Sequence, residues 1–216
     1  MDPSSLAFRA LFIIPTMLSL TVHEWAHAWS AWKLGDDTAA REGRLSLNPI
    51  VHIDPLGTIL LPLLGVPFGW AKPVPVNPAR FRRGVNMSTG MALTAAAGPL
   101  SNLVLAVLCA VALGLTLRFA PQVLAGDKGL FTLLIYGVQL NVGLAIFNLL
   151  PLPPLDGSRI VTRFMPRQWE NAWESFSRFG PLVLFAVIAT GGSFLSGPIG
   201  AVSQWLFGLI RTISGS

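Results

Sequence analysis

Three long apolar runs dominate the pattern of hydrophobic and polar positions along the chain. They cover residues 6–32, 87–117 and 130–150. A helix needs about 20 consecutive apolar residues to cross the hydrocarbon core of a bilayer. Each run is long enough, so the sequence predicts three membrane-spanning helices.

Two further apolar segments are interrupted by residues that break helices. Residues 54–70 contain three prolines and three glycines, too many for a regular helix. We expect a short re-entrant or β-like element there, since irregular backbone at membrane depth must be buried against protein or line a cavity. Residues 181–210 contain Gly191-Gly192 and Gly197-Pro198. They are predicted as a fourth, kinked span, with a span plus an interfacial piece as the alternative.

The composition agrees with a membrane protein. Hydrophobic residues make up 52% of the 216 residues and charged residues only 12%, whereas soluble chains carry about a quarter charged residues. The predicted fold class is therefore an all-α polytopic membrane protein, a single domain over residues 1–216 with the lipid bilayer as its surroundings. The net charge of +5 does not indicate a nucleic-acid partner, because the basic residues interrupt apolar runs instead of forming a patch interleaved with aromatics.

The basic residues predict the orientation of the spans. Of the 15 lysines and arginines, seven lie between the first and second runs and four between the third and fourth, whereas the connection between the second and third holds two. Positively charged loops remain in the cytoplasm. We therefore expect a multi-pass protein of the cell membrane, of the prokaryotic inner membrane type, with its N-terminus outside and residues 33–86 and 151–180 facing the cytoplasm.

The first run contains the string His23-Glu24-Trp25-Ala26-His27. In a helix this spacing places both imidazoles on one face, one turn apart, with the glutamate beside them, which is a typical zinc-binding arrangement with an attached base. Two histidines hydrogen-bonded in a protein core would be the structural alternative. Ionisable side chains within a span are costly unless they serve a site, which favours metal binding.

A catalytic zinc ion takes three protein ligands and keeps a position for water. Asp156 is the candidate for the third ligand, since it follows the third run on the cytoplasmic side, where His23 and His27 also lie. It comes after prolines 151, 153 and 154 in a still apolar stretch, where an unpaired carboxylate would be expensive. His52 is the main rival, but it has no helical spacing to the other histidines and precedes a turn signal.

The zinc motif, Gly98-Pro-Leu-Ser-Asn102 and Asn148-Leu-Leu-Pro-Leu-Pro-Pro-Leu-Asp156-Gly157 together resemble the site-2 protease family of intramembrane metalloproteases, over about residues 10–165. The chain is similar to the short prokaryotic type, with no room for an inserted PDZ domain or a CBS domain. The resemblance implies that His23, His27 and Asp156 bind Zn²⁺ and that Glu24 is catalytic. It also implies that Asn148 lies near the substrate backbone, although helix packing would explain that residue too. For Asn102, packing and a site role remain equal alternatives.

The predicted function is hydrolysis of peptide bonds within or near transmembrane segments of membrane-protein substrates, by a zinc metalloprotease. A membrane zinc transporter or a catalytically inactive metal-binding scaffold is the alternative, although a transporter would be expected to show inverted repeats and several metal sites. A soluble zinc protease is rejected because its motif helix would not lie within a spanning run. The oligomeric state and the substrate are left open.

Overall fold

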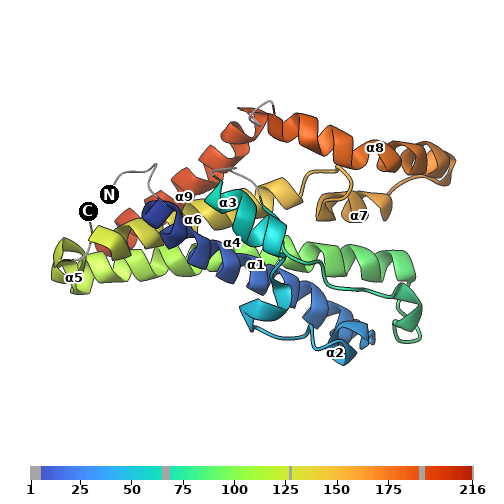
Figure 1. Cartoon of the computed structure of the whole chain (residues 1–216), viewed down its shortest axis with the longest axis horizontal. Coiled ribbons are helices and arrows are strands. Elements are labelled where there is room, and N and C mark those ends of the chain that lie inside the picture. The colour runs from blue at the N-terminus through green and yellow to red at the C-terminus, as the bar shows by residue number, and fades with distance from the viewer. Residues whose placement is uncertain (1–5, 65–68, 127, 190–192, 216) are drawn as a thin grey trace.

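The computed structural model describes residues 6–64, 69–126, 128–189 and 193–215, and its regular elements there are all helical (Figure 1). The α-helices are α1 (Leu6–Leu34), α2 (Thr38–Arg41), α3 (Leu61–Leu63), α4 (Met87–Phe119), α5 (Pro121–Gly126), α6 (Lys128–Asn148), α7 (Asp156–Thr162), α8 (Glu170–Ala189) and α9 (Ser196–Ser214). The short connecting elements are helical turns of the 3₁₀ and π types. This is the all-α architecture that the apolar pattern predicts.

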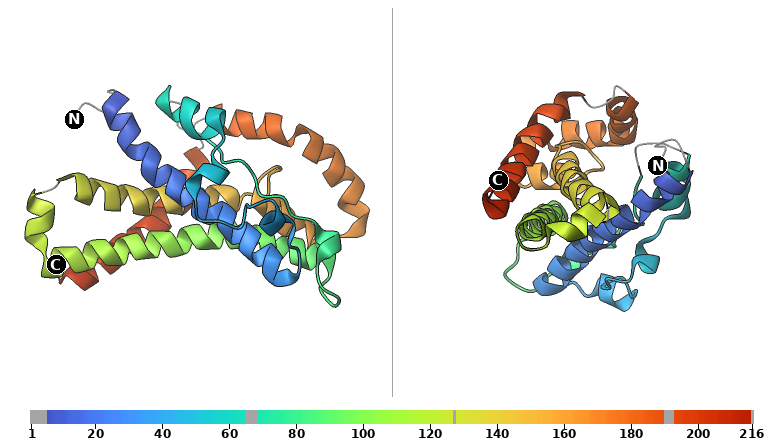
Figure 2. Two further views of the ribbon diagram at one scale, coloured as in Figure 1. Left: turned by 60° about the horizontal axis from the view of Figure 1, so that its bottom comes forward. Right: turned by 90° about the vertical axis from the view of Figure 1, so that its left-hand side faces the viewer.

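Helix α4 is the central element, because α1, α6, α7 and α9 all pack against it (Figure 2). Its contact face carries the small residues Ala106 and Ala110, which are fully buried against Val138 of α6 and Leu206 of α9. Small side chains at helix contacts let the backbones approach closely, which is how helices associate in a membrane.

The outward faces of the long helices are apolar. Leu93, Leu100, Val104 and Leu108 of α4 are each more than half exposed, which a water-facing surface would not tolerate as a continuous stripe. Within the described residues, three helical stretches are long and apolar enough to cross a bilayer: Met87–Phe119, Gly129–Asn148 and Arg167–Ala189. The protein is therefore an all-α polytopic membrane protein. The first predicted span, residues 6–32, forms α1, and its passage through the bilayer stays a prediction.

Residues 54–64 take up helical turns. The Asp54 side chain caps a π-helical turn, Pro55–Leu60, by accepting hydrogen bonds from the backbone N–H groups of Leu56 and Gly57, and α3 follows directly. The described residues of this segment include no strand. A short helical element thus replaces the β-like alternative at residues 55–63, whereas residues 65–68 lie outside the described part of the chain.

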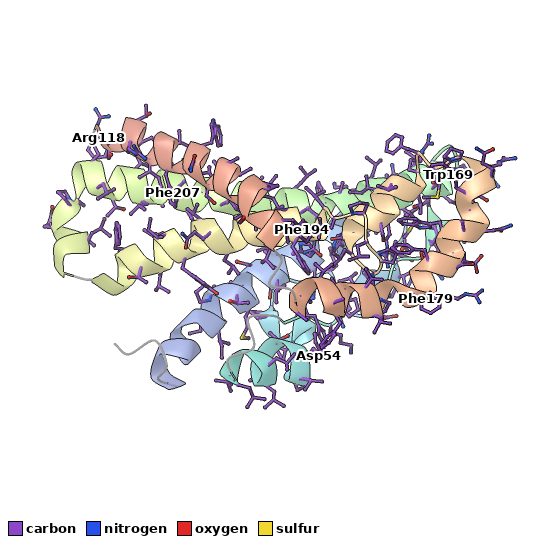
Figure 3. All side chains as sticks on the ribbon, turned by 90° about the horizontal axis from the view of Figure 1, so that it is seen from above. Asp54, Arg118, Trp169, Phe179, Phe194 and Phe207 are labelled. Atoms are coloured by element: carbon purple, nitrogen blue, oxygen red, sulfur yellow. The ribbon has the colours of Figure 1, made fainter. Side chains whose placement is uncertain are left out.

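The C-terminal region differs from the single kinked span predicted over residues 181–210. It forms two helices, α8 and α9, which run in different directions (Figure 1). Helix α8 also begins well before residue 181, at Glu170, and its charged first turns are exposed near Trp169 (Figure 3). Its inner face packs through Gly180 and Leu184 against the segment before α7.

Candidate metal centre and active-site cavity

Helix α1 presents two histidines one turn apart, and the start of α7 supplies a carboxylate beside them. The Nε2 atoms of His23 and His27 are 3.0 Å apart. Oδ2 of Asp156 lies 3.2 Å from the first and 3.3 Å from the second. The two histidines are buried. Among the described residues, His23, His27 and Asp156 form the one group of side chains whose ligand atoms lie close enough together to bind a single metal ion.

The outer hydrogen bonds show which imidazole nitrogens face the cluster. Nδ1 of His23 donates to Oδ1 of Asn102 over 2.6 Å, and Nδ1 of His27 donates to the carbonyl oxygen of Thr94 over 2.7 Å. Both partners can only accept, so each neutral ring keeps its proton on Nδ1 and turns the lone pair of Nε2 toward Asp156.

Three acceptor atoms thus point at one another, which is repulsive unless a cation lies between them. Oδ2 of Asp156 is buried and has no hydrogen-bond partner among the described residues. With metal–nitrogen distances of about 2.0–2.1 Å, a tetrahedral zinc site has ligand atoms about 3.3 Å apart, close to the spacing of these three. The residues therefore fit a zinc ion with three protein ligands.

A chain of buried amides fixes the orientation of His23. Nδ2 of Asn141 on α6 donates to the carbonyl oxygen of Gly137 over 2.8 Å, which leaves its Oδ1 to accept from Nδ2 of Asn102 at 2.9 Å. Asn102 must then present its own Oδ1 to His23. Asn102 is completely buried, and its hydrogen bond to His23 is a direct contact with the site in addition to helix packing. Such outer partners orient metal ligands.

Two glycines allow the ligands to approach. A Cβ atom at Gly98 of α4 would lie 2.4 Å from Nε2 of His27, and one at Gly157 would lie 2.2 Å from the carbonyl oxygen of Leu149. Both spacings are far below van der Waals contact. Gly98 therefore gives the imidazoles their space, and Gly157 lets the first turn of α7 pack on the end of α6, which places Asp156.

A cavity of about 810 Å³ opens beside this cluster, with both apolar and polar walls. His23 and Glu24 of α1 line it together with Asn148 of α6, and other walls come from residues 57–58, 69–71, α8 and α9. Oε2 of Glu24 accepts a hydrogen bond of 2.9 Å from the backbone N–H of Val74. Asn148 donates from Nδ2 to the carbonyl oxygen of Leu144 one turn earlier, and an amide keeps further hydrogen-bonding capacity toward the cavity.

His52 does not join the metal cluster. It is 2% exposed, and its Nε2 lies 2.8 Å from the carbonyl oxygen of Ser46 in the loop after α2. Its backbone carbonyl accepts a hydrogen bond from Lys72, so its visible contacts tie loop segments together. The interactions of Thr94, Asn141 and Val74 with the site had no signal in the sequence, because two of them use backbone atoms and the third is an ordinary amide within an apolar helix.

Comparison with known proteins agrees with this geometry. The model of peptidase family M50 matches residues 122–188, which include Asp156. YwhC of Bacillus subtilis strain 168 is 39% identical over 93% of this chain and 86% of its own length. Rip2 of Mycolicibacterium smegmatis is 29% identical over 93% of this chain and 71% of its own length. Both relatives are named zinc metalloproteases, and no solved structure matches.

The fold and the cluster are those of a membrane-embedded zinc metalloprotease. The chain belongs to peptidase family M50, the site-2 protease family. Zinc is its cofactor, as in the family and as the His-His-Asp cluster allows.

Proposed function

We propose that this metalloprotease cleaves peptide bonds within or near transmembrane segments of membrane-protein substrates. In the proposed site, His23, His27 and Asp156 hold the zinc ion and Glu24 is the general base. One observation carries the proposal most directly: the ligand atoms of His23, His27 and Asp156 converge beside a cavity of about 810 Å³ that His23 and Glu24 line.

The division of labour follows from the side chains. A zinc ion with two neutral imidazoles and one carboxylate retains positive charge, which supplies Lewis-acid activation of a water molecule and of the scissile carbonyl. Glu24 accepts the proton of the attacking water and passes it to the leaving amine. Asn148 offers an amide to the substrate backbone, which must leave its helical hydrogen bonds before a carbonyl is accessible.

The test of the function is zinc content measured together with cleavage of a model transmembrane peptide by the purified chain in detergent. We expect one zinc per chain and cleavage that is lost on chelation and restored by added zinc. Zinc without cleavage would contradict the proposal and favour the transporter or the inactive scaffold. Against a transporter, the described residues hold one ligand cluster and not a succession of clusters along a path.

The substrate contact is tested by Asn148→Ala. We expect cleavage per folded molecule to fall about tenfold while zinc content stays unchanged, because the amide lines the cavity without joining the metal cluster. The measurement is peptide cleavage against elemental analysis on the same preparation. A variant that accumulates poorly, with normal cleavage per folded molecule, would instead show that Asn148 serves helix packing.

The orientation is tested by reporter fusions. Helix α2, the start of α4 and α7 lie toward one end of the molecule and α5 lies at the other (Figures 1 and 2). The two loops that we expect in the cytoplasm, residues 33–86 and 151–180, include 11 of the 15 basic residues. Fusions after Arg83 and after Arg167 should therefore both report the cytoplasm. Opposite compartments would contradict the proposal that the active site opens toward the cytoplasmic side.

A further inference from the structure

The segment formed by residues 71–77 has no regular secondary structure and is hydrogen-bonded to Glu24 of α1, the residue next to His23 of the metal cluster. Pro73 and Pro75 have no backbone N–H group, so five of the seven residues of the segment can donate a backbone hydrogen bond. One of these donors, on Val74, points to Glu24, with 2.9 Å between the nitrogen and Oε2. A second, on Lys72, binds the carbonyl oxygen of His52 over 2.9 Å.

Two buried charged residues hold this segment in place. Arg44, which is 5% exposed, donates from Nη2 to the carbonyl oxygens of Lys72 and Pro73, over 2.5 and 3.2 Å. Asp36, which is fully buried at the end of α1, accepts from the backbone N–H of Asn77 over 2.6 Å. The contacts with the segment lie on both sides of Val74. Burying an arginine and an aspartate is costly unless their polar groups have partners. The backbone groups of the segment supply such partners to Arg44 and Asp36, and the two side chains in turn hold the segment.

We propose that the 71–77 segment positions the catalytic base: Arg44 and Asp36 hold it so that the Val74 N–H fixes the carboxylate of Glu24. The bond occupies Oε2 and leaves Oε1 to accept the proton of the attacking water. A hydrogen bond to an ionised carboxylate is among the stronger ones in proteins, and it restricts rotation of the terminal carboxylate, which otherwise has a broad torsional distribution. The inference rests on the proposed role of Glu24 as general base.

The contact between Val74 and Glu24 does not have the geometry of a mobile segment that detaches to release the base. A segment that detaches would be held at one end only. Residues 71–77 are instead bonded to Arg44, in the loop after α2, before Val74 and to Asp36, after the end of α1, beyond it. Arg82 adds a further bond, from its backbone N–H to the carbonyl oxygen of Leu34 over 2.8 Å. A fixed segment is suited to orienting Glu24 throughout the reaction.

The sharpest test removes the donor itself. Val74→Pro deletes the N–H group within a segment that already contains prolines, and Val76→Pro is the matched control, since the Val76 N–H makes no hydrogen bond among the described residues. We expect Val74→Pro to lower kcat for the transmembrane model peptide about tenfold or more, with the 10²- to 10⁴-fold contribution of a general base as the upper bound. KM should stay within about twofold and zinc at one per chain. Val76→Pro should keep kcat within about twofold of the parent.

A second pair of variants covers the case in which Val74→Pro fails to fold. Arg44→Met removes both bonds to the segment carbonyls and should lower kcat in the same way, with KM and zinc content unchanged. Arg44→Lys retains a cation that can bind one carbonyl and should restore part of the loss. Partial rescue of kcat at constant zinc supports positioning, because a merely structural defect would reduce the folded fraction instead.

The failure of this inference is distinct from the failure of the proposed function. Full kcat in Val74→Pro, with Glu24→Gln inactive, would overturn the positioning role alone. An increase in KM with kcat unchanged would also overturn it, because the segment would then act on substrate binding. Activity in Glu24→Gln would overturn the assignment of the base, and the inference with it.

Discussion

We expect Glu24→Gln to lower peptide cleavage by at least about 100-fold while the protein keeps one zinc per chain. The glutamine has the size of glutamate and can still meet the N–H of Val74 through its carbonyl oxygen, but it cannot accept the proton of the attacking water. General-base catalysis contributes about 10²- to 10⁴-fold, and the remaining activity is what zinc and substrate binding supply alone. Cleavage kinetics and elemental analysis on the same preparation measure both quantities.

The same substitution at Glu42 is the matched control. This glutamate is exposed at the end of α2 and makes no contact with the metal cluster, so Glu42→Gln should cleave as fast as the parent. Cleavage by Glu24→Gln within tenfold of the parent would show that another group takes the proton. Loss of zinc from this variant would mean that Glu24 supports the metal ligands, and the assignment of its role would have to change.

Much of the site was predictable because its chemistry is local in the sequence. The spacing of His23 and His27 places both side chains on the same face of any helix. The prolines before Asp156 indicate that the preceding helix ends there and that a carboxylate follows. The structure brings these three together, as the sequence predicts. Their role as the zinc ligands stays a prediction until metal binding is measured.

The contacts that orient the ligands were not predictable, because they depend on how helices pack. Asn102 and Asn141 belong to different helices, 39 positions apart, and no periodicity of either helix indicates that their amides meet. The contact between Val74 and Glu24 joins positions separated by 50 residues and uses a backbone atom, so the side-chain pattern carries no trace of it. Sequence patterns therefore identify candidate metal ligands better than the hydrogen-bond partners that orient these ligands.

The fold shows a similar division. The second and third predicted spans end within two residues of α4 and α6, since long apolar runs specify helices strongly. The C-terminal region was harder, because Glu170, Glu174 and Arg178 made its first turns look like a loop. These side chains are exposed in α8, and the stretch Arg167–Ala189 has a lower mean hydropathy than the other two stretches that are long and apolar enough to cross a bilayer.

The largest effect on metal binding is expected from Asp156. Asp156→Ala leaves only the two imidazole nitrogens of His23 and His27, 3.0 Å apart, one fewer than the three protein ligands of a catalytic zinc site. We expect cleavage to disappear and zinc affinity to fall by more than the 10- to 100-fold typical of losing an outer partner of a metal ligand. Zinc per chain is measured by elemental analysis after dialysis against a weak chelator, with cleavage assayed in parallel.

His52→Ala separates the two candidate ligand sets. Its imidazole is bonded to the carbonyl oxygen of Ser46 and lies outside the cluster, so this variant should keep one zinc per chain and cleave the peptide. Asp156→Asn adds a second comparison, since it preserves volume but removes the negative charge, and its zinc affinity should fall between the parent and Asp156→Ala. If Asp156→Ala held zinc as firmly as the parent while His52→Ala lost it, the third ligand would be His52. The converging carboxylate at α7 would then need another explanation.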